Sequence, residues 1–425
     1  MLLQYDIENN LSVKSRQRVA FIADNKKELV DSEIDVLGYK ILPVIGLYGK
    51  NASGKTNLLK GLKHIYDMVI LSHSFDPARP IPFYTPFAFT KEKNKESKFE
   101  ITFMINEKRY VYGFSHDSLE IKEEYLYVFN SSKPSKIFDK DINTQEVYTF
   151  GQNYSGLKDY VGKTHKNKLF LSTAAQWAAD QKEINDIYNF FRNGMVYYQK
   201  DCGIPSVEFE NETTSLLIED ENARKFFKTL ISYLDLEIED IKPTKIPVDL
   251  NELPEEVKKI IEAARNGDKN LEATSVKTLY NINGVNYDLD LKQESNGIQK
   301  IYQLFPLLYH GLNSKKIIVI DEIETGLHPL LIKGIIKLFQ NKNINKYNSQ
   351  LFFTTHNTSI LDLELLRRDQ IWFTEREQDN EYSTEVYSLV DVKGVRTSDN
   401  IEREYLKGEY TKTPREILWN SNKVE

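Results

Sequence analysis

The sequence predicts an α/β fold that carries an antiparallel β subdomain and a mainly helical insertion. An apolar run at 41–48 leads into a glycine-rich loop, and apolar residues at helical spacing follow at 57–71. Residues 99–121 alternate between apolar and polar, which is typical of an antiparallel meander with one packed face. Residues 176–273 show the spacing of amphipathic helices.

The remaining elements follow in chain order. Apolar runs at 2–7 and 18–22 predict two short strands, and a proline-rich connection occupies 77–86. Residues 254–264 resemble a helix start. After Asn296, buried strands and helices are expected to alternate, with runs at 317–320, 330–339, 351–354 and 371–373.

The length of 425 residues exceeds one typical domain, so we expect a head that is split by an insertion. The expected parts are an N-terminal lobe at 1–175, a helical insertion at 176–275, a C-terminal lobe at 276–390 and a tail at 391–425.

Composition limits the class of protein. Cys202 is the only cysteine, which excludes an internal disulfide and a multi-cysteine metal site. No run is long enough to span a bilayer, and no secretion signal opens the sequence, so we expect a cytoplasmic protein without a membrane partner. The net charge of −7 argues against a uniformly basic surface for nucleic acid, although it does not exclude a local patch.

A complete phosphate-loop motif, G-x-x-x-x-G-K-[ST], lies between the predicted strand and helix at 49–56. A chance match in a chain of this length is on the order of 1–2%. Lys55 would reach the β- and γ-phosphates, and the Thr56 hydroxyl would bind Mg²⁺. We therefore expect ATP and Mg²⁺ as ligands. The predicted nucleotide-binding residues are Gly49, Asn51, Ser53, Gly54, Lys55, Thr56 and Asn57.

Two further predicted strands end in polar residues. The strand at 317–320 is followed by Asp321, a candidate Mg²⁺ ligand, and Glu322, a candidate for polarising the attacking water. The strand at 351–354 leads to His356, which is a candidate for contacting the γ-phosphate or the water. Taken alone, surface acids at a strand end or a structural histidine would explain either pattern.

The segment 295–300 has the form S-x-G-x-x-K and precedes helical spacing. Ser295 and Gly297 at a helix N-terminus could bind an anion. The alternative is a plain N-cap at Ser295.

Together these motifs resemble the ABC ATPase superfamily in its SMC, RecF and OLD branch, an AAA-type class of ATPases. Residues 295–300 are similar to its signature motif, 324–329 to its D-loop in the E-x-G-L-H-P form, and His356 to its switch histidine. The resemblance implies an ABC-type P-loop ATPase head, in which Asp321 and Glu322 form the Walker B end. It also implies a dimer or larger ring, with ATP held between Lys55 of one copy and the signature Ser295 and Gly297 of the next.

A closer resemblance is to the single-head abortive-infection ATPases of the RloA, AbiL and PARIS kind. The stretch 169–176 is similar to their LFLSxAAQ segment and 405–410 to their YLxGxY ending. This likeness gives Gln176 the Q-loop role of a metal contact. It implies an ATP-hydrolysing sensor or scaffold in antiphage defence, which regulates a separate TOPRIM-type nuclease encoded nearby.

The residues after His356 are too few for a TOPRIM domain and contain no Asp-x-Asp, so we do not expect this chain to cut nucleic acid itself. A phage trigger protein or nucleic acid is a further expected partner. The alternative function is a DNA-repair ATPase of the RecF or SMC kind. A transporter's nucleotide-binding subunit is disfavoured, because the D-loop form and the long insertion match a different branch.

Overall fold

The computed structural model describes residues 1–25, 28–90, 95–130, 133–198, 205–247, 272–376 and 381–410. The chain forms two compact units. Unit 1 comprises Met1–Gln199, Gly311–Thr325 and Ile335–Glu425, and unit 2 comprises Lys200–His310 and Gly326–Gly334. The described residues from 176 to 198 belong to unit 1. The strand at the end of this segment, Met195–Tyr198, pairs with another strand of unit 1, Ile317–Ile320. The predicted helix start at 254–264 and the residues after 410 lie outside the described part of the chain.

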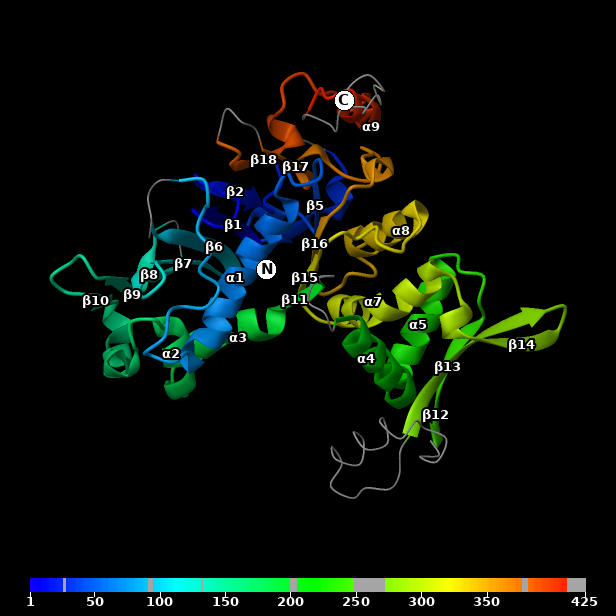
Figure 1. Ribbon diagram of the computed structural model, residues 1–425, viewed down its shortest axis with the longest axis horizontal. Helices are drawn as coiled ribbons and strands as arrows, with labels where there is room; N and C mark the ends of the chain where they lie inside the picture. The colour runs from blue at the N-terminus through cyan, green and yellow to red at the C-terminus, as the bar shows by residue number, and fades with distance from the viewer. Residues whose placement is uncertain are drawn as a thin grey trace, which may run out of the picture. The chain divides into compact units, whose positions relative to one another are not determined.

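Unit 1 contains a six-stranded sheet in the order β11-β15-β16-β5-β17-β18 (Figure 1). The first five strands run parallel, and β18 is antiparallel to β17. Every residue of β5, β15 and β16 is buried, which explains their continuous apolar runs. The bounds are β5 Val44–Tyr48, β11 Met195–Tyr198, β15 Ile317–Ile320, β16 Gln350–Thr354, β17 Ile371–Arg376 and β18 Thr384–Ser388.

The second sheet of unit 1 is antiparallel and has seven strands in the order β10-β9-β8-β7-β6-β1-β2. The predicted alternation is confirmed in β6, where Phe99, Ile101 and Phe103 are buried. It stops at Leu119, which lies in the turn before β8 and is exposed. The bounds are β1 Leu2–Glu8, β2 Gln17–Ala20, β6 Ser97–Ile105, β7 Lys108–His116, β8 Ile121–Phe129, β9 Ser135–Asp141 and β10 Tyr148–Phe150. A separate hairpin joins β3 Ile34–Val36 to β4 Tyr39–Ile41.

Helix α1 spans Lys55–Leu71 and packs against the antiparallel sheet and helices α2 and α3. Its Gly61 faces Ile7 of β1, where a Cβ atom would stand 2.8 Å from the Ile7 Cδ1. This close approach brings the helix of the phosphate loop onto the second sheet. The other helices that contribute to unit 1 are α2 Phe170–Trp177, α3 Lys182–Gly194, α9 Ile401–Leu406, and the C-terminal parts of α7 Asn296–Asn313 and α8 Pro329–Gln340.

Unit 2 contains helices α4 (Pro205–Glu219) and α5 (Glu221–Tyr233) and the first part of α7. Phe227 of α5 packs edge-on against Phe305 of α7, with ring centroids 4.8 Å apart. The helices agree with the predicted character of this region. A three-stranded sheet was not predicted, and it consists of β12 Asp240–Pro247, β13 Glu272–Ile282 and β14 Val285–Asp290. Within the described residues, no helix combines the length and the apolar character needed to cross a membrane.

Candidate nucleotide-binding site

The phosphate loop leaves β5 at Gly49 and enters α1 at Lys55. Gly49 and Gly54 both adopt positive φ, at 152° and 108°, and Gly54 is the N-cap of α1. Neither position has room for a side chain. A Cβ at Gly54 would stand 2.0 Å from the Thr384 Oγ1, and one at Gly49 would stand 2.5 Å from the Thr374 carbonyl oxygen. The motif therefore folds into the strand–loop–helix arrangement that suits phosphate binding.

Lys55 is folded back over its own loop. Its ammonium donates to the carbonyl oxygens of Gly49 at 2.7 Å and Lys50 at 3.2 Å, and the side chain is nearly buried. Burial lowers the pKa of Lys55 to about 8, against the opposing effect of nearby carboxylates, of which Glu324 is the strongest. The ammonium thus lies at the mouth of the loop, where an anion would meet it.

Thr56 and Asp321 meet although they are far apart in sequence. The Thr56 hydroxyl donates to the Asp321 Oδ1 at 3.2 Å, and the Thr354 hydroxyl donates to the same oxygen at 2.5 Å. Mg²⁺ favours one or two hard oxygen ligands from protein, with phosphate and water completing its shell. The Thr56 and Asp321 oxygens fit that requirement. In the described residues, no cluster of three or more His, Cys, Asp and Glu side chains could hold a metal alone.

Glu322 follows directly after β15 and has a φ of 51°, an unusual value for a residue with a side chain. Its amide donates to the Thr354 hydroxyl at 2.8 Å, and its Oε2 accepts from the Thr325 hydroxyl at 3.4 Å. The carboxylate is only half-buried, so it is available to a water molecule at the carboxyl edge of the sheet.

His356 lies at the same edge, two residues after β16. Its Nδ1 is 3.4 Å from the Lys55 ammonium, and burial together with that ammonium lowers the pKa of His356. The backbone amide of His356 donates to the Glu324 Oε1 at 2.7 Å. The other oxygen of Glu324 is buried and has no hydrogen-bond partner among the described residues. Sequence reasoning placed Glu324 only in the D-loop and did not assign it to this contact.

Side chains from segments that are distant in sequence form hydrogen bonds that hold the phosphate loop in place. The Ser53 hydroxyl bonds the Thr374 hydroxyl at 2.6 Å, and the Thr384 hydroxyl donates to the Ser53 carbonyl oxygen at 3.1 Å. Asn57 donates to the Ser12 hydroxyl at 2.8 Å, which in turn bonds Thr384 at 2.7 Å. The predicted contact Asn51 is exposed on the loop. Sequence reasoning missed Ser12, Thr374 and Thr384, because no local pattern connects them with the loop.

Gln176 does not reach the phosphate loop, which corrects the expected Q-loop role. It is exposed near the C-terminal end of α2, and its amide bonds the Ser172 carbonyl oxygen at 3.4 Å. The beginning of α2 lies beside the end of α1, since the Leu169 amide donates to the Ser72 hydroxyl at 3.2 Å. The length of α1, roughly 25 Å at 1.5 Å per residue, separates that end from the loop. Gln176 is therefore too far away to contact the metal.

Ser295 and Gly297 belong to unit 2, at the start of α7. The Ser295 hydroxyl is exposed and accepts from the Ile298 amide at 3.4 Å, as a weak helix cap would. A Cβ at Gly297 would meet only ordinary contacts, the nearest 3.5 Å away on Leu331. The exposed helix start is open to a ligand or to another molecule.

Comparisons with known proteins identify one family. The profile of the family described as "AAA domain, putative AbiEii toxin, Type IV TA system" matches residues 44–362. No curated protein sequence is significantly similar to the chain. One solved structure, an Smc head bound to the C-terminal winged-helix domain of ScpA, is 12% identical, with a TM-score of 0.47, covering 91% of this chain and 97% of that one.

A second solved structure is an Smc head domain with an extended coiled coil, bound to the C-terminal domain of ScpA from Pyrococcus furiosus. It is 13% identical, with a TM-score of 0.40, and the match covers 91% of this chain and 96% of that one. The family match includes the phosphate loop, the carboxylates after β15 and the histidine after β16. The chain belongs to the family of proteins described as "AAA domain, putative AbiEii toxin, Type IV TA system".

Proposed function

We propose that this chain binds ATP with Mg²⁺ at the carboxyl edge of its parallel sheet and hydrolyses it. The observation that carries the proposal is the convergence of three strand ends. β5 leads to Lys55 and Thr56, β15 to Asp321 and Glu322, and β16 to His356. An ammonium, two oxygens that could hold Mg²⁺ and a carboxylate that could orient water are groups that phosphoryl transfer to water uses, and the imidazole lies beside them.

Each residue has one role in this proposal. Lys55 and the loop amides bind the β- and γ-phosphates, and Thr56 and Asp321 hold Mg²⁺, which neutralises phosphate charge when bound. Glu322 orients a water molecule and accepts its proton, because it is the carboxylate of the pair that does not bond Thr56 or Thr354 through its side chain. His356, beside Lys55, faces the terminal phosphate.

The direct test is phosphate release from ATP by the purified chain, compared with Lys55→Ala. Loss of the ammonium at the mouth of the loop should lower the rate by roughly a hundredfold or more. Lys60→Ala is the matched control, since Lys60 is an exposed lysine on the same helix. Equal rates for wild type and Lys55→Ala would contradict the proposal.

We further propose that the active form is a homo-oligomer in which Ser295 and Gly297 of one copy close over the nucleotide of another. Support comes from the start of α7, which carries the signature-like sequence and is exposed at Ser295. Hydrolysis would then open the assembly and act as a timer.

In the cell, we propose a sensor or scaffold role in abortive infection, with a separate TOPRIM-type nuclease as effector. The family's description as AbiEii-type toxins and the likeness of 169–176 and 405–410 to abortive-infection ATPases support this role. The test is phage protection in cells that carry this gene alone and in cells that also carry its neighbouring genes. Full protection by the gene alone would contradict the need for a separate effector, and association with recombination genes would favour the DNA-repair alternative.

A further inference from the structure

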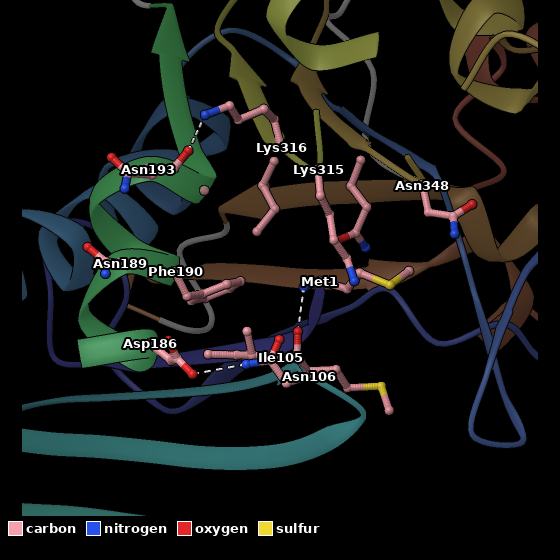
Figure 2. Close-up of a pocket in the computed structure, with 14 residues that line it drawn as sticks. Met1, Ile105, Asn106, Asp186, Asn189, Phe190, Asn193, Lys315, Lys316 and Asn348 are labelled. Carbon is pink, nitrogen blue, oxygen red and sulfur yellow. Dashed lines mark hydrogen bonds between the residues drawn. The ribbon is translucent and has the colours of Figure 1, made fainter. Parts of the chain in front are cut away.

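A cavity of about 360 Å³ lies in unit 1 at the edge of the parallel sheet where β15 and β16 begin (Figure 2). Ile317 and Gln350, the first residues of these two strands, line it. The end of α3 and the turn between β6 and β7 complete its wall. The phosphate loop and its partners lie at the opposite, carboxyl edge of the same sheet, so this cavity belongs to no part of the nucleotide site.

Two adjacent lysines reach into this cavity. Figure 2 shows Lys316 turned toward Asn193, whose carbonyl oxygen accepts from its ammonium, and Lys315 turned toward Met1. Lys315 forms no hydrogen bond or ion pair with any residue that the structure describes. Burial lowers the pKa of both lysines, and no carboxylate opposes that effect.

The one acidic side chain that lines the cavity does not balance these charges. Figure 2 shows Asp186 bonded to Asn106, whose amide donates to its Oδ2 at 3.0 Å. The rest of the wall is mixed: apolar side chains such as Ile105, Phe190 and Met1 alternate with the amide side chains of several asparagines and of Gln350. The Lys315 side chain is exposed to solvent, so an anion that enters the cavity can reach its ammonium, and the apolar side chains of the wall favour a ligand with an apolar body.

We propose that this cavity binds a small organic anion, whose carboxylate, sulfonate or phosphate group pairs with Lys315 and whose apolar body packs on Phe190 and Ile105. The volume is in the range of small-molecule sites. The ligand would touch the beginning of β15, four residues before Asp321. It would therefore contact a strand whose other end carries the carboxylates of the nucleotide site. The inference does not depend on ATP hydrolysis.

Anilinonaphthalene sulfonate, a fluorescent anion with an apolar body, is a suitable probe, and phenylnaphthylamine is its uncharged counterpart. Wild type should bind one molecule of the sulfonate saturably and more tightly than the amine. Lys315→Gln should weaken sulfonate binding roughly tenfold and leave amine binding unchanged. Because the Lys315 ammonium has no hydrogen-bond or ion-pair partner in the described part of the chain, the substitution should not affect folding, which circular dichroism checks.

Two controls locate the probe. Lys342→Gln removes an exposed lysine that does not line the cavity, and it should bind the sulfonate as wild type does. Lys55→Ala should also bind it normally, because the phosphate loop is a different site. The proposal is overturned by equal sulfonate affinity in wild type and Lys315→Gln, by amine binding as tight as sulfonate binding in wild type, by loss of binding in Lys55→Ala, or by no saturable binding in wild type.

Discussion

The Thr56 hydroxyl lies 3.2 Å from the Asp321 Oδ1, which joins the first turn of α1 to the end of β15 across 265 positions of sequence. The contact brings together the two oxygens that we assign to Mg²⁺. It also fixes the distance between the phosphate loop and Glu322, the next residue along the chain. The position of the Glu322 carboxylate, for which we propose the hydrolytic role, thus depends on a contact made at the loop.

Thr56→Val keeps the shape of the side chain and removes the hydroxyl, so Mg²⁺ should no longer strengthen nucleotide binding. The dissociation constant of a fluorescent ATP analogue should fall roughly tenfold or more on adding Mg²⁺ to wild type, and change little in the variant. Thr229→Val, on the exposed face of α5, is the control. A wild-type response to Mg²⁺ in Thr56→Val would remove this residue from the metal site.

Glu322→Gln should still bind ATP. It should hydrolyse ATP about a hundredfold more slowly than wild type, because the glutamine amide cannot accept a proton from water. If ATP bridges two copies, the variant should accumulate as an ATP-dependent dimer or larger assembly. Sedimentation with and without ATP measures this. Normal turnover together with no association would contradict both the role and the bridged arrangement.

Ser295→Arg should block closure over a neighbour's nucleotide while leaving the affinity of the separate subunit for ATP near that of wild type. Mixed with Lys55→Ala, it should regain part of the ATPase activity, because one intact composite site can form in a mixed dimer. Phosphate release is measured across mixing ratios. No recovery at any ratio would indicate that each site is built within one chain.

Gln176→Ala should leave both nucleotide affinity and the rate of hydrolysis within about twofold of wild type. The Gln176 side chain is exposed on α2, and α2 begins beside the end of α1 that is far from the phosphate loop. A large loss of activity in Gln176→Ala alone would restore the original assignment.

His64 of α1 and His116 of β7 form a buried pair, with their Nε2 atoms 2.8 Å apart. The His116 Nδ1 is 2.8 Å from the Asp117 carbonyl oxygen, so in the neutral pair it donates there and its Nε2 accepts from His64. Burial lowers the pKa of His116 to about 4, and burial followed by the charge of its neighbours lowers that of His64 well below its usual value.

The unfolded chain, with histidine pKa values near 6.5, therefore takes up protons that the folded chain does not. The free energy of unfolding should fall as pH drops from about 6.5 toward 4, by about 1 kcal/mol or more for each histidine. Urea unfolding at several pH values measures this fall. It should be smaller in a His64→Gln, His116→Gln double variant and unchanged in His310→Gln, where an exposed histidine is removed. An equal fall in all three proteins would exclude the pair as its source.

Sequence reasoning was most successful where the signal is local. The phosphate loop, its strand and its helix form one continuous segment, and apolar runs identify β15 and β16 because both are buried on both faces. The sheet of unit 2 gave no such signal. β12 contains prolines, and β14 is exposed at nearly every position, so neither shows a packed face.

The assignment of Gln176 failed for a different reason. The apolar residues at 169–174 are buried in the core of unit 1. The amides of Phe170 and Leu171, at the start of α2, donate to the buried carboxylate of Glu124. The pattern therefore reflects the anchoring of a helix and carries no information about the metal. The contact of Ser53 with Thr374 depends on tertiary folding, so local sequence motifs do not predict it.

The contacts of the phosphate loop with Thr374 and Thr384 also have a consequence for folding during synthesis of the chain. Ser53 bonds Thr374 across 321 positions, and Gly54 lies directly against Thr384. The glycine-rich loop leaves the ribosome long before either threonine has been synthesised. A nascent chain that stops just after His356 would contain that histidine, Lys55 and the carboxylates of Asp321 and Glu322. It would lack β17 and β18, whose threonines contact the loop. We therefore expect each polypeptide to become able to take up nucleotide late in its synthesis, once β17 and β18 have been translated and have joined the sheet.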